Sequence, residues 1–443
     1  MNPYVADMRA MRGRMRAALR KGMIAVLDVG SAKTACFVLR VDLARLDKAA
    51  ESAAHDAFGA IRVVGAGVTQ SRGVKLGEIV DLEEAEKAVR TALEKAEKMA
   101  GERVDQVIAC VSGARPESAG FFGEVEVEGD VVTRRDIARA LAACDWPARR
   151  EGREVIHAMP VNFTLDNSTN AAQPIGMAAR HIAVDMHTIS VADAPLRTLA
   201  ACVRRCDLEL AGVVSAPYAA AMSSLVEDEK KLGAACVELG AGSTNVSIFL
   251  HNHLIHTQSI RMGGDHVTQD IASGLFMPTN AAERIKSFHG GAVATGLDDR
   301  ELIEAPSLAE DHPSDRRRIS RSALIGVIRP RIEEILEEAR RALDAAGFLH
   351  LPGRRIVLTG GGAQLTGVEE VAQRILGRQV RIGRPLRLGG LPQATTGPEF
   401  AAAVGLAIHA ARPQDELWDF EHVGPLSGRR RISGALRWFK DNW

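Results

Sequence analysis

The chain has 443 residues, of which 46% are hydrophobic, and its 56 basic and 56 acidic residues cancel. This length exceeds that of one ordinary domain and predicts at least two cores. A zero net charge gives no general reason to expect nucleic-acid binding, and we expect none. The six cysteines form no CxxC pair, no signal peptide is recognisable and no apolar run approaches the ~20 residues that span a bilayer, so we expect a cytosolic protein.

The first half of the chain alternates strand and helix signals. Residues 1–21 carry six basic residues against one acid and are expected to be a disordered basic arm. Two strand-like runs flank a glycine turn in MIAVLDVGSAKTACFVLR (23–40), and a third run follows in IRVVGAGV (61–68). Residues 82–100 have apolar residues at helical spacing and predict an amphipathic helix. Residues 104–165 resemble a small α/β unit.

The second half begins by repeating the opening pattern. Strand, helix, strand and helix signals run through 181–227, and residues 233–260 return to two strands around a glycine turn. A helix is predicted at 319–346, where Pro330 should kink or divide it. A strand at 355–359 runs into a glycine cluster, and a helix is predicted near 397–411.

Two strand–turn–strand segments match each other. AVLDVGSAKTACFVL (25–39) and ACVELGAGSTNVSIFL (235–250) place Asp28 opposite Glu238 and Gly30 opposite Gly240. A pattern that recurs once at long separation predicts two related lobes rather than a solenoid.

These turns have the composition of a phosphate site. Small residues let several backbone N–H groups gather around phosphate oxygens, and a carboxylate at the strand end can orient water on Mg²⁺. Two facing hairpins could clamp a polyphosphate. A third motif, IVLTGGGAQLTG (356–367), would let the backbone approach a flat ligand such as adenine or ribose, and it is neither a P-loop nor a GxGxxG motif.

These three motifs, in this order, resemble those of the actin, DnaK-type chaperone and sugar-kinase superfamily. Within it the chain is most similar to the FtsA family of bacterial cell-division proteins, from about residue 22 to 443, in stretches such as RGVKLGEIVDLEEAEKAV (72–89) and AAERIKSFHG (281–290). The resemblance implies an α/β, two-lobed actin-like fold (a ribonuclease H-like repeat) with an inserted small α/β subdomain and a C-terminal amphipathic helix.

The resemblance also implies a division of the chain into domains. In order, these are a basic N-terminal arm (1–21), the first part of lobe I (22–81), the inserted subdomain (82–166), the second part of lobe I (167–211), lobe II (212–411) with an FtsZ-tail-binding subdomain (262–330) and a final helix returning to lobe I, a flexible linker (412–428) and a membrane-targeting helix (429–443).

ATP and Mg²⁺ are the cofactors that the resemblance implies. Asp28 and Glu238 would hold the metal through water, and Glu238 would be the catalytic residue. The family usually has Asp where Glu238 stands and often Asp where Asn245 stands, so we expect ATP binding with at most slow ATPase activity. The implied nucleotide-binding residues are Asp28, Gly30, Ser31, Ala32, Lys33, Gly240, Ala241, Gly242, Ser243, Thr244, Asn245, Gly263, Gly264, Glu283, Lys286, Gly360, Gly361 and Gly362.

The end of the chain has the pattern of a membrane-surface helix. Apolar residues recur at i, i+4, i+7 and i+11, and basic residues lie at the margins and on the opposite face. A basic helix with aromatic and aliphatic residues is typical of membrane-surface binding. The predicted membrane-binding residues are Arg430, Arg431, Ile432, Leu436, Trp438, Phe439, Lys440 and Trp443.

Membership of this family would imply an actin-like division protein that polymerises and tethers the FtsZ ring to the cytoplasmic face of the bacterial inner membrane. Its partners would be the FtsZ C-terminal tail, other copies of itself, anionic lipid and late division proteins such as FtsN. A sugar kinase, a DnaK-type chaperone and a pilus-assembly actin homologue remain alternatives. A kinase would need a catalytic Asp between the lobes, and a chaperone would need a peptide-binding domain after the last helix.

Overall fold

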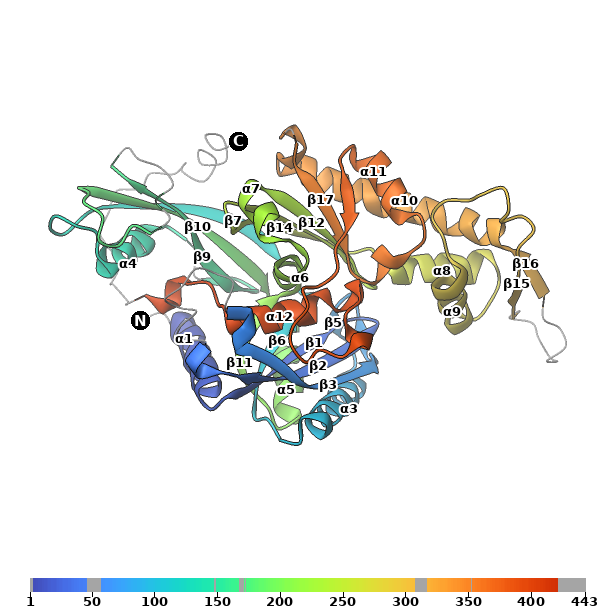
Figure 1. The fold of residues 1–443 in the computed structure, drawn as a ribbon, viewed down its shortest axis with the longest axis horizontal. Coiled ribbons are helices and arrows are strands. Elements are labelled where there is room, and N and C mark those ends of the chain that lie inside the picture. The colour runs from blue at the N-terminus through green and yellow to red at the C-terminus, as the bar shows by residue number, and fades with distance from the viewer. Residues whose placement is uncertain are drawn as a thin grey trace.

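The computed structural model describes residues 3–45, 57–146, 149–166, 171, 173–306, 317–351 and 353–420. It is an elongated α/β molecule built on two large sheets (Figure 1). The predicted membrane helix 429–443, and the part of the predicted linker from 421 to 428, lie outside the described residues. No helix in the described ranges is long and apolar enough to cross a membrane.

Lobe I is built on a five-stranded sheet. Helices α3 (Leu82–Ala100) and α5 (Asp193–Arg205) pack against it, and α12 (Ala401–Ala411) packs on β1, β2 and β6. Strands covered in this way read as continuous apolar runs, which is how the sequence presents them. In sheet order the strands are β11 (Glu209–Ser215), β6 (Gln106–Val111), β1 (Met23–Val29), β2 (Lys33–Val41) and β3 (Ile61–Gln70).

The second sheet has nine strands and joins two units. Its first five strands form lobe II and its last four form the inserted unit, and the two groups meet through one residue pair, Gln258↔Glu117. In sheet order the strands are β18 (Val380–Ile382), β17 (Arg355–Thr359), β12 (Ala234–Leu239), β13 (Thr244–Leu250), β14 (His253–Ile260), β7 (Glu117–Glu126), β10 (His181–Ala192), β9 (Arg153–Leu165) and β8 (Arg149–Arg150).

The inserted unit differs from the expected range 82–166. Helix α3 packs on β3 and β2, and β6 lies between β1 and β11, so both belong to lobe I. The unit consists instead of β7, β8, β9, β10 and α4 (Arg134–Ala143), and it extends to residue 192. The strands and the helix within 104–165 occur as the sequence predicts. A local pattern, however, does not indicate which sheet a strand joins.

Two helices cross between the lobes. Helix α6 (Ala216–Ser224) packs on β12 and β13 of lobe II and also on β11, while α12 covers the lobe I sheet. The helices meet so closely that a Cβ on Gly405 would lie 1.8 Å from the backbone oxygen of Ala219. Helices α6 and α12 therefore pack directly against each other between the two sheets.

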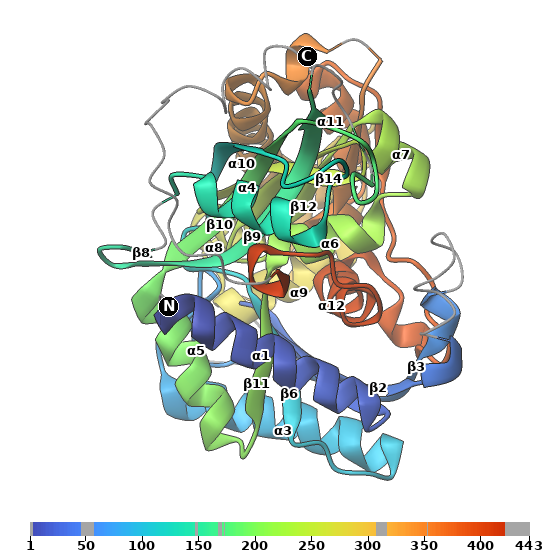
Figure 2. The ribbon, with the colours of Figure 1, turned by 90° about the vertical axis from the view of Figure 1, so that its left-hand side faces the viewer.

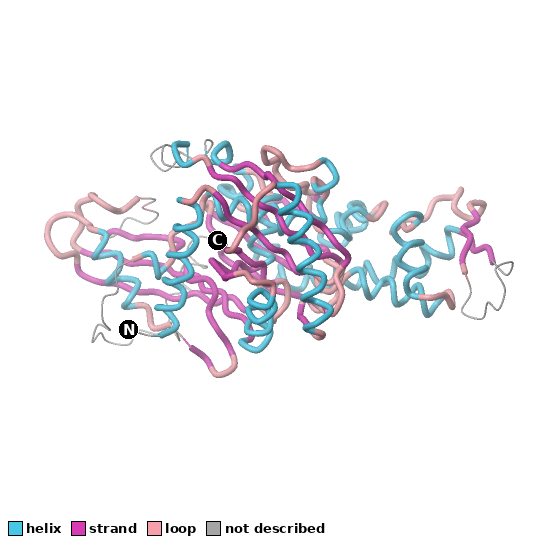
Figure 3. The backbone as a smooth tube through the Cα atoms, turned by 90° about the horizontal axis from the view of Figure 1, so that it is seen from below, coloured by secondary structure: helices cyan, strands magenta, loops and turns pink. Residues whose placement is uncertain are grey.

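Lobe II carries most of the remaining helices, and a small subdomain extends from it (Figure 3). Helix α10 runs unbroken through Pro330, so the predicted division there is wrong; one lost backbone hydrogen bond does not end a helix that buries nine side chains. The elements are α7 (Glu227–Leu232), α8 (Gly264–Gly274), α9 (Thr279–His289), β15 (Leu302–Ala305), β16 (Arg317–Ser320), α10 (Arg321–Ala345) and α11 (Val368–Leu376).

The short elements lie mainly in the connections between these helices and strands. They are η1 (Ala57–Ala60), β4 (Val74–Lys75), β5 (Glu78–Ile79), η2 (Phe348–His350), η3 (Gly361–Gln364), η4 (Gln393–Thr395), η5 (Pro398–Phe400) and η6 (Leu417–Asp419).

The N-terminal segment is a helix, not the disordered arm that its basic composition predicted. Helix α1 (Pro3–Arg20) packs along β11 and β1 and buries Met8, Met15 and Leu19. Figure 2 shows the last described residues, in red, between α1 and the inserted unit. Met8, Met15 and Leu19 form an apolar stripe along the helix. A prediction from the number of basic residues alone overlooks this stripe.

Candidate nucleotide-binding site

The two predicted phosphate turns have the same geometry. In the first, the N–H of Gly30 donates to the carbonyl of Lys33 at 3.1 Å, and in the second the N–H of Gly240 donates to the carbonyl of Ser243 at 3.0 Å. Each turn closes an antiparallel hairpin whose first strand has a parallel neighbour, β6 for β1 and β17 for β12. The structure thus confirms the internal repeat.

The turns from the two lobes lie against each other. A Cβ on Gly242 would lie 2.4 Å from the Oγ of Ser31 and 2.7 Å from the Cα of Leu76. The same Oγ accepts a hydrogen bond from the N–H of Gly77 at 2.8 Å. Within the described ranges, the N–H groups of four turn residues donate to no protein acceptor: Ser31, Ala32, Ala241 and Gly242. Free donors in facing turns form a concavity suited to anionic oxygens.

Helices α8 and α9 attach to the second turn. The N–H of Gly264, at the start of α8, donates to the carbonyl of Gly240 at 2.9 Å. Lys286 of α9 donates from Nζ to the carbonyl of Gly264 at 3.0 Å and to Glu283 at 2.7 Å. Burial alone would raise the pKa of Glu283, but Lys286 and neighbouring hydroxyl donors hold it below its usual value. Helix α9, which carries the predicted nucleotide-binding residues Glu283 and Lys286, is therefore hydrogen-bonded to α8 beside the second turn.

The triple glycine lies at the end of β17, beside β12. A Cβ on Gly360 would lie 2.5 Å from the carbonyl oxygen of Leu239, and one on Gly362 would lie 2.9 Å from the Leu239 Cβ. Gly360 also has φ +84°, which favours glycine. A Cβ on Gly361, by contrast, would meet only the Glu399 Cβ at 3.7 Å. Two of the glycines are thus required for packing, and Gly361 has room beside it.

The two predicted metal-binding carboxyls lie near each other, with Asp28 buried and Glu238 half-buried. Burial raises the pKa of Asp28, against the nearby charge of Lys33 and a hydrogen bond from Ser112. Burial also raises the pKa of Glu238 to about 7, and the Asp28 charge adds to the rise. Asn245 donates to Glu238 at 2.8 Å, while its own Oδ1 is buried without a partner.

These groups fit a hydrated Mg²⁺ ion better than a directly ligated one. Carboxylates are the donors Mg²⁺ prefers, and the ion usually keeps several waters and a substrate phosphate in its shell. No cluster of three or more His, Cys, Asp or Glu side chains able to hold a metal occurs in the described part of the chain. Asp28 and Glu238 are the residues that would hold such an ion through water, which stays a prediction.

Some contacting residues were not predicted. Ser112 follows β6 and reaches Asp28 at 3.3 Å, and Thr268 of α8 accepts from Lys286 at 2.8 Å. Leu76 and Gly77 lie in the loop between β4 and β5. This loop belongs to the stretch RGVKLGEIV (72–80), which is similar to the FtsA family. Ser112 directly follows a β-strand, a position where binding residues are common in α/β proteins. The residues around it in the sequence form no motif that would have identified it.

A cavity of about 480 Å³ adjoins the second turn. It is lined by residues from the junction of lobe II with the inserted unit, including Arg115, Glu117, His256 and Arg261. Of the predicted nucleotide-binding residues only Ser243 lines it. The predicted nucleotide-binding residues thus lie mainly on the converging glycine segments beside this cavity, not in it.

Solved structures share the fold at low sequence identity. The PilM–PilN type IV pilus biogenesis complex matches with a TM-score of 0.59 and 14% identity, over 88% of this chain and 99% of that one. MreB 5 of Spiroplasma citri, solved with AMPPNP bound, matches with a TM-score of 0.50 and 15% identity, over 87% and 95%. At these identities the likeness shows the fold alone.

The fold and the paired turns define an actin-like protein. Curated relatives named cell division protein FtsA are 37% identical in Agrobacterium fabrum, over 96% of each chain, and 30% identical in Escherichia coli K12, over 88% of this chain and 91% of the relative. The family model of cell division protein FtsA matches residues 235–405, and that of the SHS2 domain inserted in FtsA matches 113–190. The chain belongs to the FtsA family of cell-division proteins.

Proposed function

We propose that this division protein binds ATP between its lobes, polymerises, and tethers the FtsZ ring to the cytoplasmic face of the bacterial inner membrane. The observation that carries the nucleotide part is the contact between the two phosphate turns, Ser31 against Gly242, with unpaired N–H groups on both. Bound Mg²⁺ would neutralise phosphate charge. The chain's own part is to orient the phosphates with backbone N–H groups and to hold water at Asp28 and Glu238.

The membrane part depends on residues 429–443. Each basic residue near an anionic surface contributes about 1 kcal/mol, so Arg430, Arg431 and Lys440 together with the apolar face give reversible binding. The described chain ends at Phe420, on the side of the molecule where α1, lobe I and the inserted unit meet (Figure 2). The last described segment therefore lies against α1 and the inserted unit.

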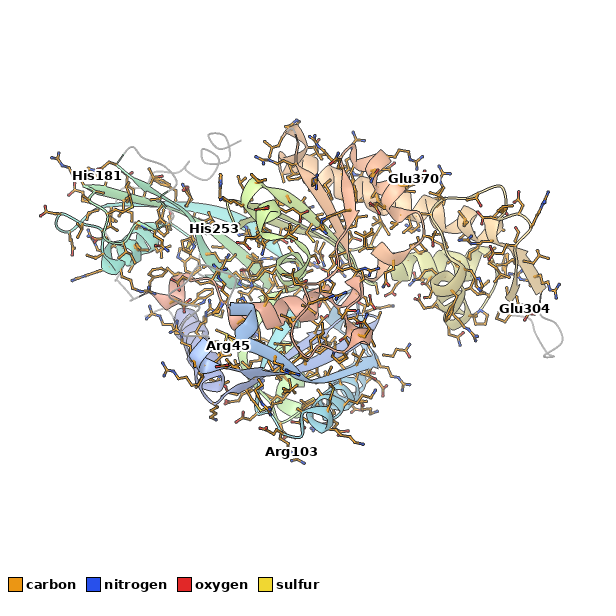
Figure 4. All side chains as sticks on the ribbon, in the orientation of Figure 1. Arg45, Arg103, His181, His253, Glu304 and Glu370 are labelled. Atoms are coloured by element: carbon orange, nitrogen blue, oxygen red, sulfur yellow. The ribbon has the colours of Figure 1, made fainter. Side chains whose placement is uncertain are left out.

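The subdomain at 262–330 is the proposed site for the FtsZ tail. It carries large apolar side chains that are more than half exposed: Phe276, Phe288, Leu297 and Leu302. Exposed apolar groups in one small subdomain favour a partner surface. Glu304 on its β15 strand lies at the far end of the molecule from His181 of the inserted unit, so the FtsZ contact and the inserted unit lie at opposite ends (Figure 4).

The test is liposome co-sedimentation of the full chain and of a chain lacking 429–443, with ATP and a peptide of the FtsZ tail. We expect the full chain to pellet with anionic vesicles and to carry the peptide, and the truncated chain to stay in the supernatant. Phe288→Asp should lose the peptide but keep the vesicles. Leu232→Asp, at a position on α7 that is 63% exposed against 76% for Phe288, should keep both. Equal pelleting of full and truncated chains contradicts the tether.

The alternative functions have less support. The likeness to the pilus protein rests on 14% identity, whereas the division proteins reach 37% over 96% of the chain. Phosphoryl transfer to a small sugar would favour a kinase instead.

A further inference from the structure

The last described segment is held by arginines of helix α1. Arg9 donates from Nε to the carbonyl of Trp418 at 3.1 Å and from Nη2 to the carbonyl of Phe420. Arg16 donates to Asp419 at 2.7 Å. These residues stand at i and i+7, so they project from the same side of α1. One helix face therefore binds both the backbone and the acidic side chain of the segment.

Arg12 is the centre of this contact. It lies in the stripe formed by Met8, Met15 and Leu19 and is only 7% exposed. Its Nη2 donates to the carbonyl of Gln414 at 2.6 Å and lies 3.2 Å from Asp419 Oδ2 and 3.5 Å from Glu416 Oε1. A buried guanidinium needs such partners because an unpaired buried charge is strongly unfavourable. The segment supplies all three.

Glu416 links the segment to both neighbouring units. Its carboxylate is 3% exposed and accepts from Nδ1 of His157 at 3.0 Å and from the N–H of Ala158 at 3.1 Å, both on β9 of the inserted unit. The Nε2 of His157 accepts from the N–H of Ser215, at the end of β11 in lobe I. Burial alone would raise the pKa of Glu416, but His157 and Arg12 hold it below its usual value.

The inserted unit adds a fourth arginine. Arg134 of α4 donates to the carbonyl of Asp419 at 3.2 Å, and its guanidinium lies 4.7 Å from the ring centroid of Phe420. Trp418 and Phe420 are 4% and 5% exposed, so both rings are inserted into the body. The segment 414–420 thus has the bonds of a docked peptide, although the sequence predicted a flexible linker from 412.

We propose that helix α1 is a clasp for the base of the C-terminal tail, and that opening this clasp lengthens the membrane tether. With the clasp closed, eight residues (421–428) separate the docked segment from the predicted membrane helix, and eight fully extended residues reach at most ~28 Å. With the clasp open, sixteen residues (413–428) separate the body from that helix, and the maximum reach doubles to ~56 Å. The clasp itself is independent of the proposed function, but its effect on tether length depends on it.

The clasp can be tested on the full chain without lipid. Hydrogen–deuterium exchange of residues 414–420 should rise at least tenfold in Arg12→Met, which keeps the apolar stripe, and in Arg16→Glu, which repels Asp419. Arg20→Glu is the matched control, because Arg20 is exposed on the same helix and has no side-chain partner among the described residues. Because Arg16 is exposed, that variant remains informative if Arg12→Met does not fold. Equal exchange in Arg16→Glu and Arg20→Glu overturns the clasp.

The tether is tested on anionic vesicles carrying an acceptor dye in the lipid. The donor dye is placed on Lys98→Cys, which is exposed on α3, whereas all six native cysteines are buried. We expect Arg16→Glu to pellet with vesicles like the parent but with lower energy transfer, and Arg20→Glu to match the parent in both. If exchange is faster but energy transfer is unchanged, the proposed lengthening of the tether is wrong, while the clasp itself stands. A parent that does not bind vesicles contradicts the proposed function and leaves the exchange result as the measure of the clasp.

Discussion

Glu238 shows how one residue sets the chemistry of the site. The native state raises its pKa from 4.5 to about 7, chiefly by burial, so the folded chain holds this proton more tightly than the unfolded chain. The stabilisation from the protonated group is fully present below pH 4.5 and is lost as pH rises to about 7. A bound cation would reverse the shift, because it favours the carboxylate.

Replacing Glu238 by Gln removes this titration. The nucleotide-free parent should lose about 3 kcal/mol of unfolding free energy, relative to the variant, between pH 4.5 and pH 7.5. Urea unfolding of both proteins across this range measures the difference. Glu94→Gln, on the exposed side of α3, is the control. Parallel curves for parent and Glu238→Gln would show that Glu238 keeps an ordinary pKa.

Lys286 should contribute to nucleotide affinity. It holds α9 to the start of α8, and a hydrogen bond to a charged group contributes about 1.5–3 kcal/mol. Lys286→Met should weaken ATP binding about tenfold or more in calorimetry. Lys87→Met is the matched control, because Lys87 forms the same i,i+3 pair with Glu84 at 2.7 Å on α3 of lobe I. Equal affinities in the two variants contradict the role of Lys286.

Turnover of ATP should be slow or undetectable. Glu238 is one methylene longer than Asp and would move a metal-bound water, and Asn245 donates to it where a second acid would help coordinate a cation. Steady-state phosphate release measures this. A rate typical of a dedicated ATPase that is abolished by altering Glu238 would show that the longer side chain is no obstacle.

At the scale of elements, the pair α6 and α12 is the tightest contact between the lobes. Alanine at position 405 gains up to about 1 kcal/mol in helix propensity, but its Cβ would lie 1.8 Å from the Ala219 oxygen, and overpacking costs about 1–3 kcal/mol. We expect Gly405→Ala to lose about 2 kcal/mol in urea unfolding. Gly326→Ala, at an exposed site on α10 with open space around it, should be neutral or slightly stabilising.

Elements were predictable where local patterns decide them. The helix at 82–100 and the strand at 355–359 have the predicted bounds, since periodicity and flanking glycines mark both. Helix α1 was missed because its apolar stripe depends on methionines around a buried arginine, which reads as a basic arm. The docking of 414–420 was missed because its partners lie about 400 residues away in sequence.

The same limit applies to the site. The glycine turns were found because their repeat is visible in the chain, whereas Ser112 and Thr268 enter only through tertiary contact. The boundary of the inserted unit moved for a similar reason, because β6 resembles the strands of either unit and only its pairing assigns it to lobe I. The sequence thus predicts the glycine turns and their ligand class, while the supporting residues follow only from tertiary contacts.

At the scale of the whole molecule, the inserted unit has an exposed apolar patch, which we propose as a contact between copies in a polymer. Val131, Ile175 and Met177 are 45%, 54% and 47% exposed, and the backbone pairs Val131 with Ala178 and bonds Val132 to Met177. Ile175→Glu should raise the concentration needed for ATP-dependent polymers at least tenfold in pelleting assays. Val226→Glu is the control, because Val226 is 47% exposed on another part of the body. Unchanged polymerisation in Ile175→Glu would assign the contact to another surface.

The single pair between β14 and β7 has a consequence for solubility. Without the inserted unit, β14 would be the outer strand of the lobe II sheet, and a free outer strand recruits strands of other chains. The inserted unit covers that strand: it pairs with it at Gln258 and Glu117, and Ser118 Oγ accepts from the N–H of Thr257 at 2.7 Å. A chain that lacks the inserted unit would expose β14 as an unpaired edge strand. Uncontrolled strand pairing between chains would then compete with ordered assembly.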